Sequence, residues 1–379
     1  MKLLFVTGSR GEWGYIRPLL KLIKKNKNFS YKLCVTNMHL LPSFGESINE
    51  IEKDGFNVDY KINMSLDGYN HISQVKSLGV FLTSFADILA SDKPDWIILA
   101  GDRGEQLMGA IGGAYAYIPV LHIQAGEKSG NIDGMARHAI GKFAHLHIAS
   151  NKDASDRLIK LGEEKFRIHN VGAPQLDELI SGFFSSKEEI KLKLEVDLER
   201  DFMLVVQHPV TEEFDLADRQ IKETIQAINE FEMPKVVILP NNDAGSIKVR
   251  NGIENHLKGV RHIFSNISRE DYLGILKYAR IIVGNSSSGL LEAPTFKIPA
   301  VNIGRRQKGR EQGINVINVE FKKEEIMVAI QKGLSSGFRK NLDKNCQNPY
   351  GDGYSSQRIL DLLSKTVQDN KLIVKDITY

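Results

Sequence analysis

Short apolar runs alternate with amphipathic stretches along almost the whole chain. The runs have the length of buried strands, whereas the stretches between them place apolar residues three and four positions apart, as in a helix. This alternation is typical of βαβ units, in which helices cover both faces of a parallel sheet. The runs predicted to be strands are KLLFVTG, YKLCVTN, DWIILAG, PVLHIQ, HLHIAS, FMLVVQ, KVVILP, VRHIFS, RIIVGN and PAVNI.

The amphipathic stretches predict the helices that cover these sheets. Their apolar positions recur at helical spacing, with charged residues between them. The last stretch closes the chain, and such a helix in a two-domain α/β protein often returns to pack on the first half. The predicted helices are 15–25, 80–89, 107–117, 221–231, 269–278, 324–334 and 355–367.

The alternation relaxes around residues 171–194, where NVGAPQLDEL is followed by the charged stretch SSKEEIKLKL. We place the crossover between two domains there, and 379 residues suit two domains at roughly 150 residues each. The predicted first domain is Rossmann-like and comprises residues 1–175 together with a returning C-terminal helix in 355–379. The predicted second domain is also Rossmann-like and comprises residues 176–354.

Composition narrows the class of protein. The hydrophobic content of 42% and the charged content of 26% are normal for a packed globular protein. A net charge of +3 gives no electrostatic reason to expect a nucleic-acid partner. The two cysteines, Cys34 and Cys346, lack the spacing of a disulfide framework or a zinc site, which fits a reducing cytoplasm. We expect neither a signal peptide nor a membrane span, because no apolar run approaches ~20 residues.

Polar and glycine-rich motifs follow six of the predicted strands. Open α/β sheets bind ligands at the carboxyl ends of their strands, so these motifs predict a cleft between the two domains. The motifs are Gly8–Glu12, Gly101–Arg103, Gln124–Glu127, His208–Pro209, Asn241–Gly245 and Asn285–Ser287.

Carboxylates concentrate in the first half of the chain, at Asp102, Glu127 and Asp133. Carboxylates crowded into one cleft raise one another's pKa, which allows one to act as a base while another holds a proton. The alternative is an ordinary helix-surface ion pair between Asp133 and Arg137, four residues apart. That alternative leaves Asp102 and Glu127 unexplained, so we favour acid–base chemistry.

Cations and hydroxyls concentrate in the second half. Ser286 and Ser287 follow a predicted strand and open a predicted helix, whose N-terminal N–H groups suit a phosphate; an ordinary N-cap is the alternative. Glu292 is placed to bind ribose hydroxyls. Residues that suit a diphosphate are Arg10, His208, Arg305, Arg306 and Arg310. His208 could instead be a histidine of the core. For His122 and His138, a ligand-binding role and a core role both stay open.

The ordered motifs closely resemble those of the hydrolysing UDP-N-acetylglucosamine 2-epimerase family. They are GDR, HIxxGExSGxID with RHxxxKxAH, QHPVT, PNxDAGS, GNSSxG, GxRQxGRExG and YGDG, which cover nearly the full length. The resemblance implies a GT-B-like fold, no metal and no nicotinamide cofactor. It also implies a two-stage reaction. The C2 proton and UDP leave first, giving a 2-acetamidoglycal; water then adds, and a free ManNAc-type sugar departs.

The resemblance assigns roles to individual residues. Asp102, Glu127 and Asp133 are the acid–base candidates in a first domain that holds the sugar. We expect a UDP-sugar as the small-molecule partner and a homo-oligomer, a dimer or tetramer. The residues implied in substrate or UDP binding are Arg10, Arg103, Gln124, Arg137, His138, His208, Asn241, Ser286, Ser287, Glu292 and Arg306.

The chain departs from the family pattern at two places. Many relatives carry a glutamate where this chain has Gln124, and the usual RADY after the first strand is replaced by RGEW at residues 10–13. These changes resemble the branch that acts on UDP-N,N'-diacetylbacillosamine in legionaminic acid formation. The TTERPE segment of non-hydrolysing epimerases is absent, which favours hydrolysis. A GT-B glycosyltransferase and a non-catalytic UDP-sugar sensor are the alternatives from other classes.

Overall fold

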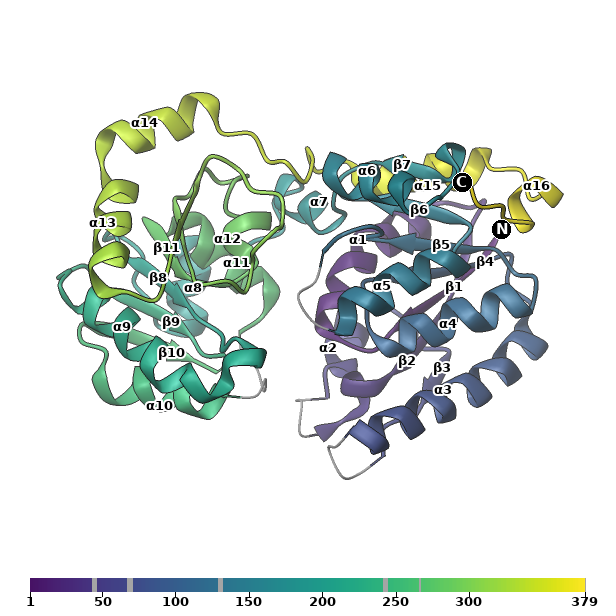
Figure 1. Cartoon of the computed structure of the whole chain (residues 1–379), viewed down its shortest axis with the longest axis horizontal. Coiled ribbons are helices and arrows are strands. Elements are labelled where there is room, and N and C mark those ends of the chain that lie inside the picture. The colour runs from purple at the N-terminus through teal and green to yellow at the C-terminus, as the bar shows by residue number, and fades with distance from the viewer. Residues whose placement is uncertain (43–45, 67–70, 129–131, 241–244, 266, 379) are drawn as a thin grey trace. The chain divides into compact units, whose positions relative to one another are not determined.

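The computed structural model contains two α/β units. Unit 1 comprises Met1–Asp177 and Tyr350–Tyr379, and unit 2 comprises Glu178–Pro349. Each unit is built on its own parallel sheet with helices on both faces (Figure 1). The residues described are 1–42, 46–66, 71–128, 132–240, 245–265 and 267–378.

The sheet of unit 1 has the order β3-β2-β1-β4-β5-β6-β7 over the residues described, and every strand pair is parallel. The strand order reverses between β1 and β4, and that switch point is where α/β sheets present ligands. The strands are β1 (Lys2–Thr7), β2 (Ser30–Thr36), β3 (Tyr60–Ile62), β4 (Trp96–Ala100), β5 (Val120–Ile123), β6 (Leu146–Ala149) and β7 (Ile168–Asn170).

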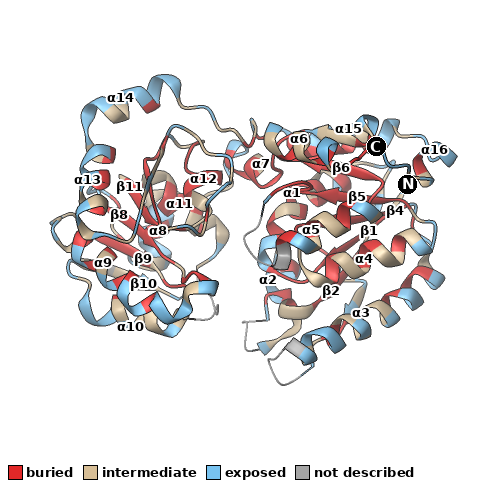
Figure 2. Cartoon of the chain, in the orientation of Figure 1, coloured by how far each residue is buried: buried red, intermediate tan, exposed pale blue. Residues whose placement is uncertain are grey.

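Each central strand of unit 1 contributes to two cores, because successive side chains point to opposite faces. In β1, Leu3 and Phe5 pack with α1 and α15, whereas Leu4 and Val6 pack with α3, α4 and α5. Figure 2 shows these strands as the buried layer between helices with exposed outer faces. The helices are α1 (Arg10–Lys25), α2 (Ile48–Lys53), α3 (His71–Asp92), α4 (Gly104–Tyr115), α5 (Ile132–Phe143), α6 (Lys152–Lys160), α15 (Ser355–Lys365) and α16 (Asn370–Ile373). Helix α7 (Gln175–Ile180) contains the boundary between the two units.

The C-terminal helices belong to unit 1, as the sequence predicted for the closing helix. Ile359 and Leu363 of α15 are fully buried in the core that α1 also lines. Beyond α15, the buried Arg167 guanidinium donates to the carbonyl oxygens of Leu372 at 2.7 Å and Val374 at 2.9 Å. These bonds tie the end of the chain to the segment before β7.

Unit 2 repeats the architecture with the order β10-β9-β8-β11-β12-β13, again parallel throughout the residues described. The order reverses between β8 and β11. The strands are β8 (Met203–Val206), β9 (Lys235–Ile238), β10 (Val260–Phe264), β11 (Ile281–Gly284), β12 (Ala300–Ile303) and β13 (Val316–Val319). The helices are α8 (Lys187–Leu194), α9 (Ala217–Asn229), α10 (Ser246–His256), α11 (Arg269–Tyr278), α12 (Ser288–Leu291), α13 (Lys323–Leu334) and α14 (Ser336–Asn345).

Two predicted helices differ from the structure in their length. The helix expected to begin at residue 15 begins at Arg10, because Ser9 caps it and accepts from the Glu12 N–H. The helix expected over 80–89 is α3, which is more than twice as long. By length and composition, the stretch Ile72–Asp92 of α3 could cross a membrane, with a mean hydropathy of 1.2. Its inner face, including Phe81 and Phe85, nevertheless packs in the core of unit 1.

Candidate active site

The carboxyl ends of three neighbouring strands in unit 1, β1, β4 and β5, carry the polar motifs predicted from the sequence. Because β1, β4, β5 and β6 are parallel and adjacent, the turns that follow them lie along one edge of the sheet. That edge contains Arg10 after β1, Asp102 and Arg103 after β4, and Gln124 and Glu127 after β5. The structure therefore brings these five predicted residues together at one edge.

The Asp102 carboxylate is held by an arginine from a helix further along the chain. Arg137 of α5 forms an ion pair with the Asp102 carboxylate and donates from Nη1 to the Gln124 carbonyl oxygen at 2.7 Å. The Arg137 side chain is 6% exposed and that of Asp102 is 20% exposed, so the carboxylate is anchored but still accessible. Asp102 is thus a partner of Arg137. Asp133 lies near the start of α5, and its side chain is outside the described residues.

Glu127 is fixed more tightly than Asp102. It is 2% exposed, and its Oε1 accepts from Asn151 Nδ2 at 3.0 Å. Asn151 in turn caps α6 by accepting from the Ala154 N–H at 2.8 Å. Gly126, at a φ of +77°, lets the turn approach this helix, since a Cβ there would lie 2.4 Å from the Ala154 oxygen.

A buried histidine supports this edge of the sheet. His122 is fully buried, and its Nε2 lies 2.6 Å from the Gly101 carbonyl oxygen, next to Asp102. Burial lowers the pKa of His122 to about 3, so the ring is neutral and positions the turn after β4. Burial also lowers the pKa of three further histidines to about 4. We call His39, His122, His145 and His147 the buried histidines of unit 1.

His138 and Arg10 reach the same edge from helices. Burial, followed by the charges of Arg137 and Arg157, lowers the pKa of His138. Arg10 is the first residue of α1, and its guanidinium forms an ion pair with Glu50 at 2.7 Å. Its predicted phosphate contact stays a prediction.

Two glutamates at this edge, Glu12 and Glu105, were absent from the predicted site. Both are 2% exposed. Glu12 accepts from the Gly8 N–H, and Glu105 accepts from Asn37 Nδ2 at 3.0 Å and pairs with Arg103 Nε at 3.3 Å. Glu12 belongs to the polar turn noted in the sequence, but its burial depends on neighbours far along the chain.

The second set of predicted residues meets at the switch point of unit 2. Asn285, after β11, accepts from the His208 N–H at 2.7 Å and donates to the His208 carbonyl oxygen at 2.9 Å. Its own carbonyl oxygen accepts from Arg306 Nη1 at 3.2 Å and from Gln307 Nε2 at 3.0 Å. His208 and Arg306 are therefore joined through Asn285, a residue in the predicted motif that was not assigned a role.

The serine segment after Asn285 is shorter as a helix than predicted. Helix α12 has only four residues, and Ser286 and Ser287 precede it. The Ser286 hydroxyl accepts from the Ser288 N–H at 3.3 Å. A single turn carries little helix dipole, so the expected contribution of a helix N-terminus to phosphate binding is small. The groups that can bind an anion here are the serine hydroxyls and the backbone N–H groups.

Glu292 ends α12 and is 5% exposed. Its Oε1 accepts from Arg269 Nη2 at 3.1 Å, and Arg269 Nε lies 3.3 Å from Glu178. Oε2 of Glu292 is buried and has no hydrogen-bond partner among the described residues. It can accept a bond from a hydroxyl group, as predicted for ribose.

Two further residues expected in the UDP site, Arg305 and Asn241, are not placed there by the structure. Arg305, suggested as a diphosphate contact, pairs with Glu213. Asn241 lies outside the described residues. No group of three or more His, Cys, Asp or Glu side chains is arranged to hold a metal ion in the described ranges.

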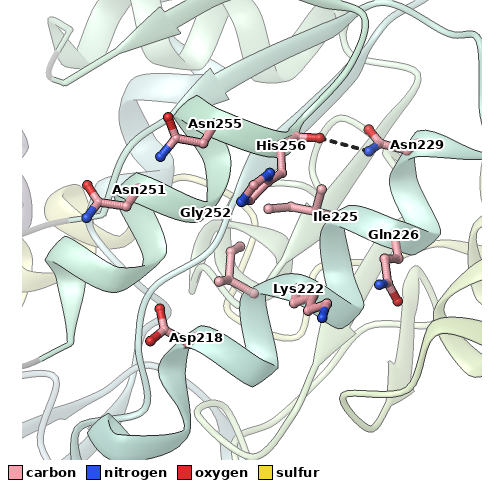
Figure 3. Close-up of a pocket in the computed structure, with 10 residues that line it drawn as sticks. Asp218, Lys222, Ile225, Gln226, Asn229, Asn251, Gly252, Asn255 and His256 are labelled. Atoms are coloured by element: carbon pink, nitrogen blue, oxygen red, sulfur yellow. Dashed lines mark hydrogen bonds between the residues drawn. The ribbon is translucent and has the colours of Figure 1, made fainter.

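A pocket of about 530 Å³ lies elsewhere in unit 2, along α9 and α10 (Figure 3). Its lining includes the apolar side chains of Ile221 and Ile225 and amides such as those of Asn251 and Asn255. All its lining residues come from these two helices and none from a strand end. It is therefore separate from the residues that carry candidate chemistry.

Comparisons with known proteins place the chain in a family. Residues 21–364 match the family described as UDP-N-acetylglucosamine 2-epimerase. The chain is 34% identical to the Legionella pneumophila UDP-N,N'-diacetylbacillosamine 2-epimerase (hydrolyzing), covering 100% of this chain and 99% of that protein. It is 31% identical to the Neisseria meningitidis UDP-N-acetylglucosamine 2-epimerase, covering 89% and 88%.

A solved structure agrees on the fold. The Neisseria meningitidis UDP-GlcNAc 2-epimerase bound to UDP-GlcNAc matches with a TM-score of 0.82 at 19% identity, over 97% of this chain and 100% of that one. This match, with the two parallel-sheet units, confirms the predicted GT-B-like class. The chain belongs to the UDP-N-acetylglucosamine 2-epimerase family of enzymes.

Proposed function

We propose that this enzyme hydrolyses a UDP-N-acetylhexosamine and inverts C2, releasing UDP and the free 2-epimer. The observation that carries the proposal is the anchored, accessible Asp102 at the switch point of unit 1, in a chain related over its full length to a hydrolysing 2-epimerase. Such a position suits a base that must reach a substrate.

The reaction has two balanced steps. In the first, a carboxylate takes the C2 proton, the C2 electrons form a C1–C2 double bond, and the C1–O bond breaks with its electrons leaving on UDP. In the second, the oxygen of water bonds to C1 and gives up one proton to a carboxylate, the C1–C2 double bond opens, and a carboxylic acid delivers a proton to C2 on the opposite face. Each proton transfer by a positioned group contributes about 10²- to 10⁴-fold. We assign these transfers to Asp102, Glu127 and Asp133.

We assign the binding of UDP to unit 2. His208 and Arg306, joined through Asn285, supply donors for the diphosphate together with Ser286 and Ser287. Charge-assisted bonds of this kind stabilise the negative charge that develops on the leaving group. Glu292 accepts ribose hydroxyls, and Asn241 completes the set. In unit 1 the remaining substrate contacts fall to Arg10, Arg103, Gln124, Arg137 and His138.

UDP-N-acetylglucosamine is the first candidate substrate and UDP-N,N'-diacetylbacillosamine the second. The second is supported by the similarity to the Legionella protein and by 32% identity to the Campylobacter jejuni GDP/UDP-N,N'-diacetylbacillosamine 2-epimerase (hydrolyzing), over 90% of this chain and 89% of that one. Gln124 in place of the usual glutamate fits that branch. Assays of both sugars side by side, comparing kcat/KM, identify the substrate.

The setting of the reaction follows from these proposals. A free ManNAc-type product suits a reaction that condenses it into a nonulosonic acid of the sialic or legionaminic type, in the cytoplasm. The chain is also 35% identical to the Escherichia coli polysialic acid biosynthesis protein P7, over 92% of this chain and 90% of that protein. We further propose a homo-oligomer, a dimer or tetramer, which light scattering on the purified protein measures.

Incubation of the enzyme with each UDP-sugar in deuterated water tests the reaction. We expect UDP release together with a free sugar that carries deuterium at C2 and the inverted configuration, read by NMR. A glycosyltransferase would require an acceptor and leave C2 unlabelled, and a sensor would return the UDP-sugar intact. Release of UDP with hydrogen retained at C2 would overturn the proposal.

A further inference from the structure

Three carboxylates and two guanidinium groups meet where β1 and β4 end. Arg103 Nε lies 3.3 Å from Glu105, and Arg137 pairs with Asp102. Each cation therefore has a carboxylate of its own. Glu12 is the third carboxylate, and it has no ion-pair partner within the described part of the chain.

Glu12 is enclosed by the turn that follows β1. Only 2% of the residue is exposed; its Oε2 accepts from the Gly8 N–H, and its Oε1 is buried without a hydrogen-bond partner among the residues described. Glu105 lies against the same turn, since a Cβ on Gly8 would be 2.1 Å from Glu105 Oε1. On the opposite side, Glu12 Cγ lies 3.7 Å from the Cβ position of Gly101, the residue before Asp102.

These surroundings disfavour a charge on Glu12. Burial is the main cause that raises its pKa, and the charge of Glu105 and, more weakly, that of Asp102 act in the same direction. Arg103 and the Gly8 N–H oppose the shift. A neutral Glu12 removes one negative charge beside the ion pairs of Arg103 with Glu105 and of Arg137 with Asp102.

We propose that Glu12 is a positioning residue that remains a neutral carboxylic acid during turnover and thereby leaves Arg103 paired with Glu105 and Arg137 paired with Asp102. The proposal rests on the function proposed above for Asp102. Its consequence is a defined alkaline limit. When Glu12 ionises, a third negative charge competes for the two guanidinium groups and opposes a reaction in which negative charge develops on the substrate.

Glu12→Gln is the decisive variant, because an amide copies the neutral acid in size and keeps both an acceptor and a donor. We expect it to retain at least about half of the wild-type kcat at pH 7, since only neutrality is required. Its activity should persist to higher pH than that of the wild type. The matched control is Glu52→Gln, an exposed glutamate of unit 1, which should leave the pH profile unchanged.

A second measurement tests the proton without depending on catalysis. When folding raises the pKa of an acidic side chain, the folded protein loses stability as the pH rises from the unfolded pKa of that side chain towards its folded pKa. The melting temperature of Glu12→Gln minus that of the wild type should therefore increase as the pH rises above the ordinary glutamate pKa. Glu12→Met, which cannot accept from Gly8, should show the same trend with a lower melting temperature at every pH.

The outcomes separate this inference from the proposed function. A folded Glu12→Gln that has lost kcat would show that the ionisable proton itself is needed and would overturn the inference. A melting difference that does not change with pH in either variant would show that Glu12 is charged and would also overturn it. If the wild type turns over neither UDP-sugar, the function fails while the melting comparison still decides the state of Glu12.

Discussion

Asp102→Asn separates the chemical role of Asp102 from its structural role, because unit 1 contains a closely matched ion pair away from the site. Arg137 and Asp102 are 6% and 20% exposed, and Arg17 and Asp54 are 7% and 22% exposed. Asp54 accepts from Arg17 at 2.9 Å and from the Trp13 indole N–H at 3.0 Å. Asp54→Asn is therefore the control for the loss of a carboxylate that anchors a buried arginine.

The expected magnitudes distinguish the two roles. In each variant the amide keeps an acceptor but removes a charge-assisted bond, so we expect a loss of about 1–3 kcal/mol of unfolding free energy. For a unit of this size that corresponds to roughly 2–4 °C per kcal/mol in melting temperature. A typical stability of 5–15 kcal/mol leaves both proteins folded. Only Asp102→Asn should also lose turnover, by about 10²- to 10⁴-fold, because it removes the base.

Three measurements on both variants decide the question: melting temperature, UDP affinity by calorimetry, and UDP release from the UDP-sugar. We expect similar melting shifts, unchanged UDP affinity, and a loss of turnover confined to Asp102→Asn. If Asp102→Asn keeps its turnover, or loses UDP affinity and turnover in equal proportion, Asp102 is an anchor for Arg137 and the assignment of the base is wrong.

Three further predictions concern both units. Arg306→Ala should weaken UDP binding by about 10- to 100-fold in calorimetry; an unchanged Kd with reduced turnover would contradict a diphosphate contact. Gly284→Ala should destabilise unit 2 by about 3 kcal/mol or more in urea unfolding, because φ is +137° and a Cβ would lie 2.0 Å from the Val206 oxygen. The control Gly337→Ala, which meets nothing within 4 Å, should be neutral or stabilising. The buried histidines of unit 1 have lowered folded pKa values, so stability should fall as pH drops from about 6.5 to 4, by up to ~1.4 kcal/mol per pH unit for each histidine; a flat profile would contradict their burial as neutral rings.

The central strands of both sheets and the edge strand β10 could be predicted from the sequence, and the other three edge strands could not. Central strands are buried on both faces and read as continuous apolar runs, as in the WIILA of β4. The three strands that the prediction missed, β3, β7 and β13, all lie at sheet edges. Their sequences, YKI, IHN and VINV, are short and contain polar residues, because one side of an edge strand lacks a neighbour.

The location of the site could be predicted, but its internal pairing could not. Parallel topology alone gathers the turns after successive strands at one edge, so Asp102, Gln124 and Glu127 were found from strand positions. The pairing of Arg137 with Asp102 depends on how α5 is rotated against the sheet. The same holds for Glu12, whose importance comes from burial beside Glu105, 93 residues away in the chain.

At position 124 the backbone holds Arg137, whereas a glutamate side chain there could also transfer a proton. Its backbone adopts a φ of +62° and its carbonyl accepts from Arg137, so it holds the arginine that anchors Asp102 whichever side chain it carries. Its side-chain amide is buried and can donate a hydrogen bond, but at neutral pH it neither gives nor takes a proton. Proton transfer in this chain therefore falls on carboxylates. Glu127 is enclosed and bonded to Asn151, whereas Asp102 is both anchored and accessible. With an amide at position 124, we therefore expect Asp102 to be the ionised base, and the proposed neutral state of Glu12 leaves its ion pair with Arg137 intact.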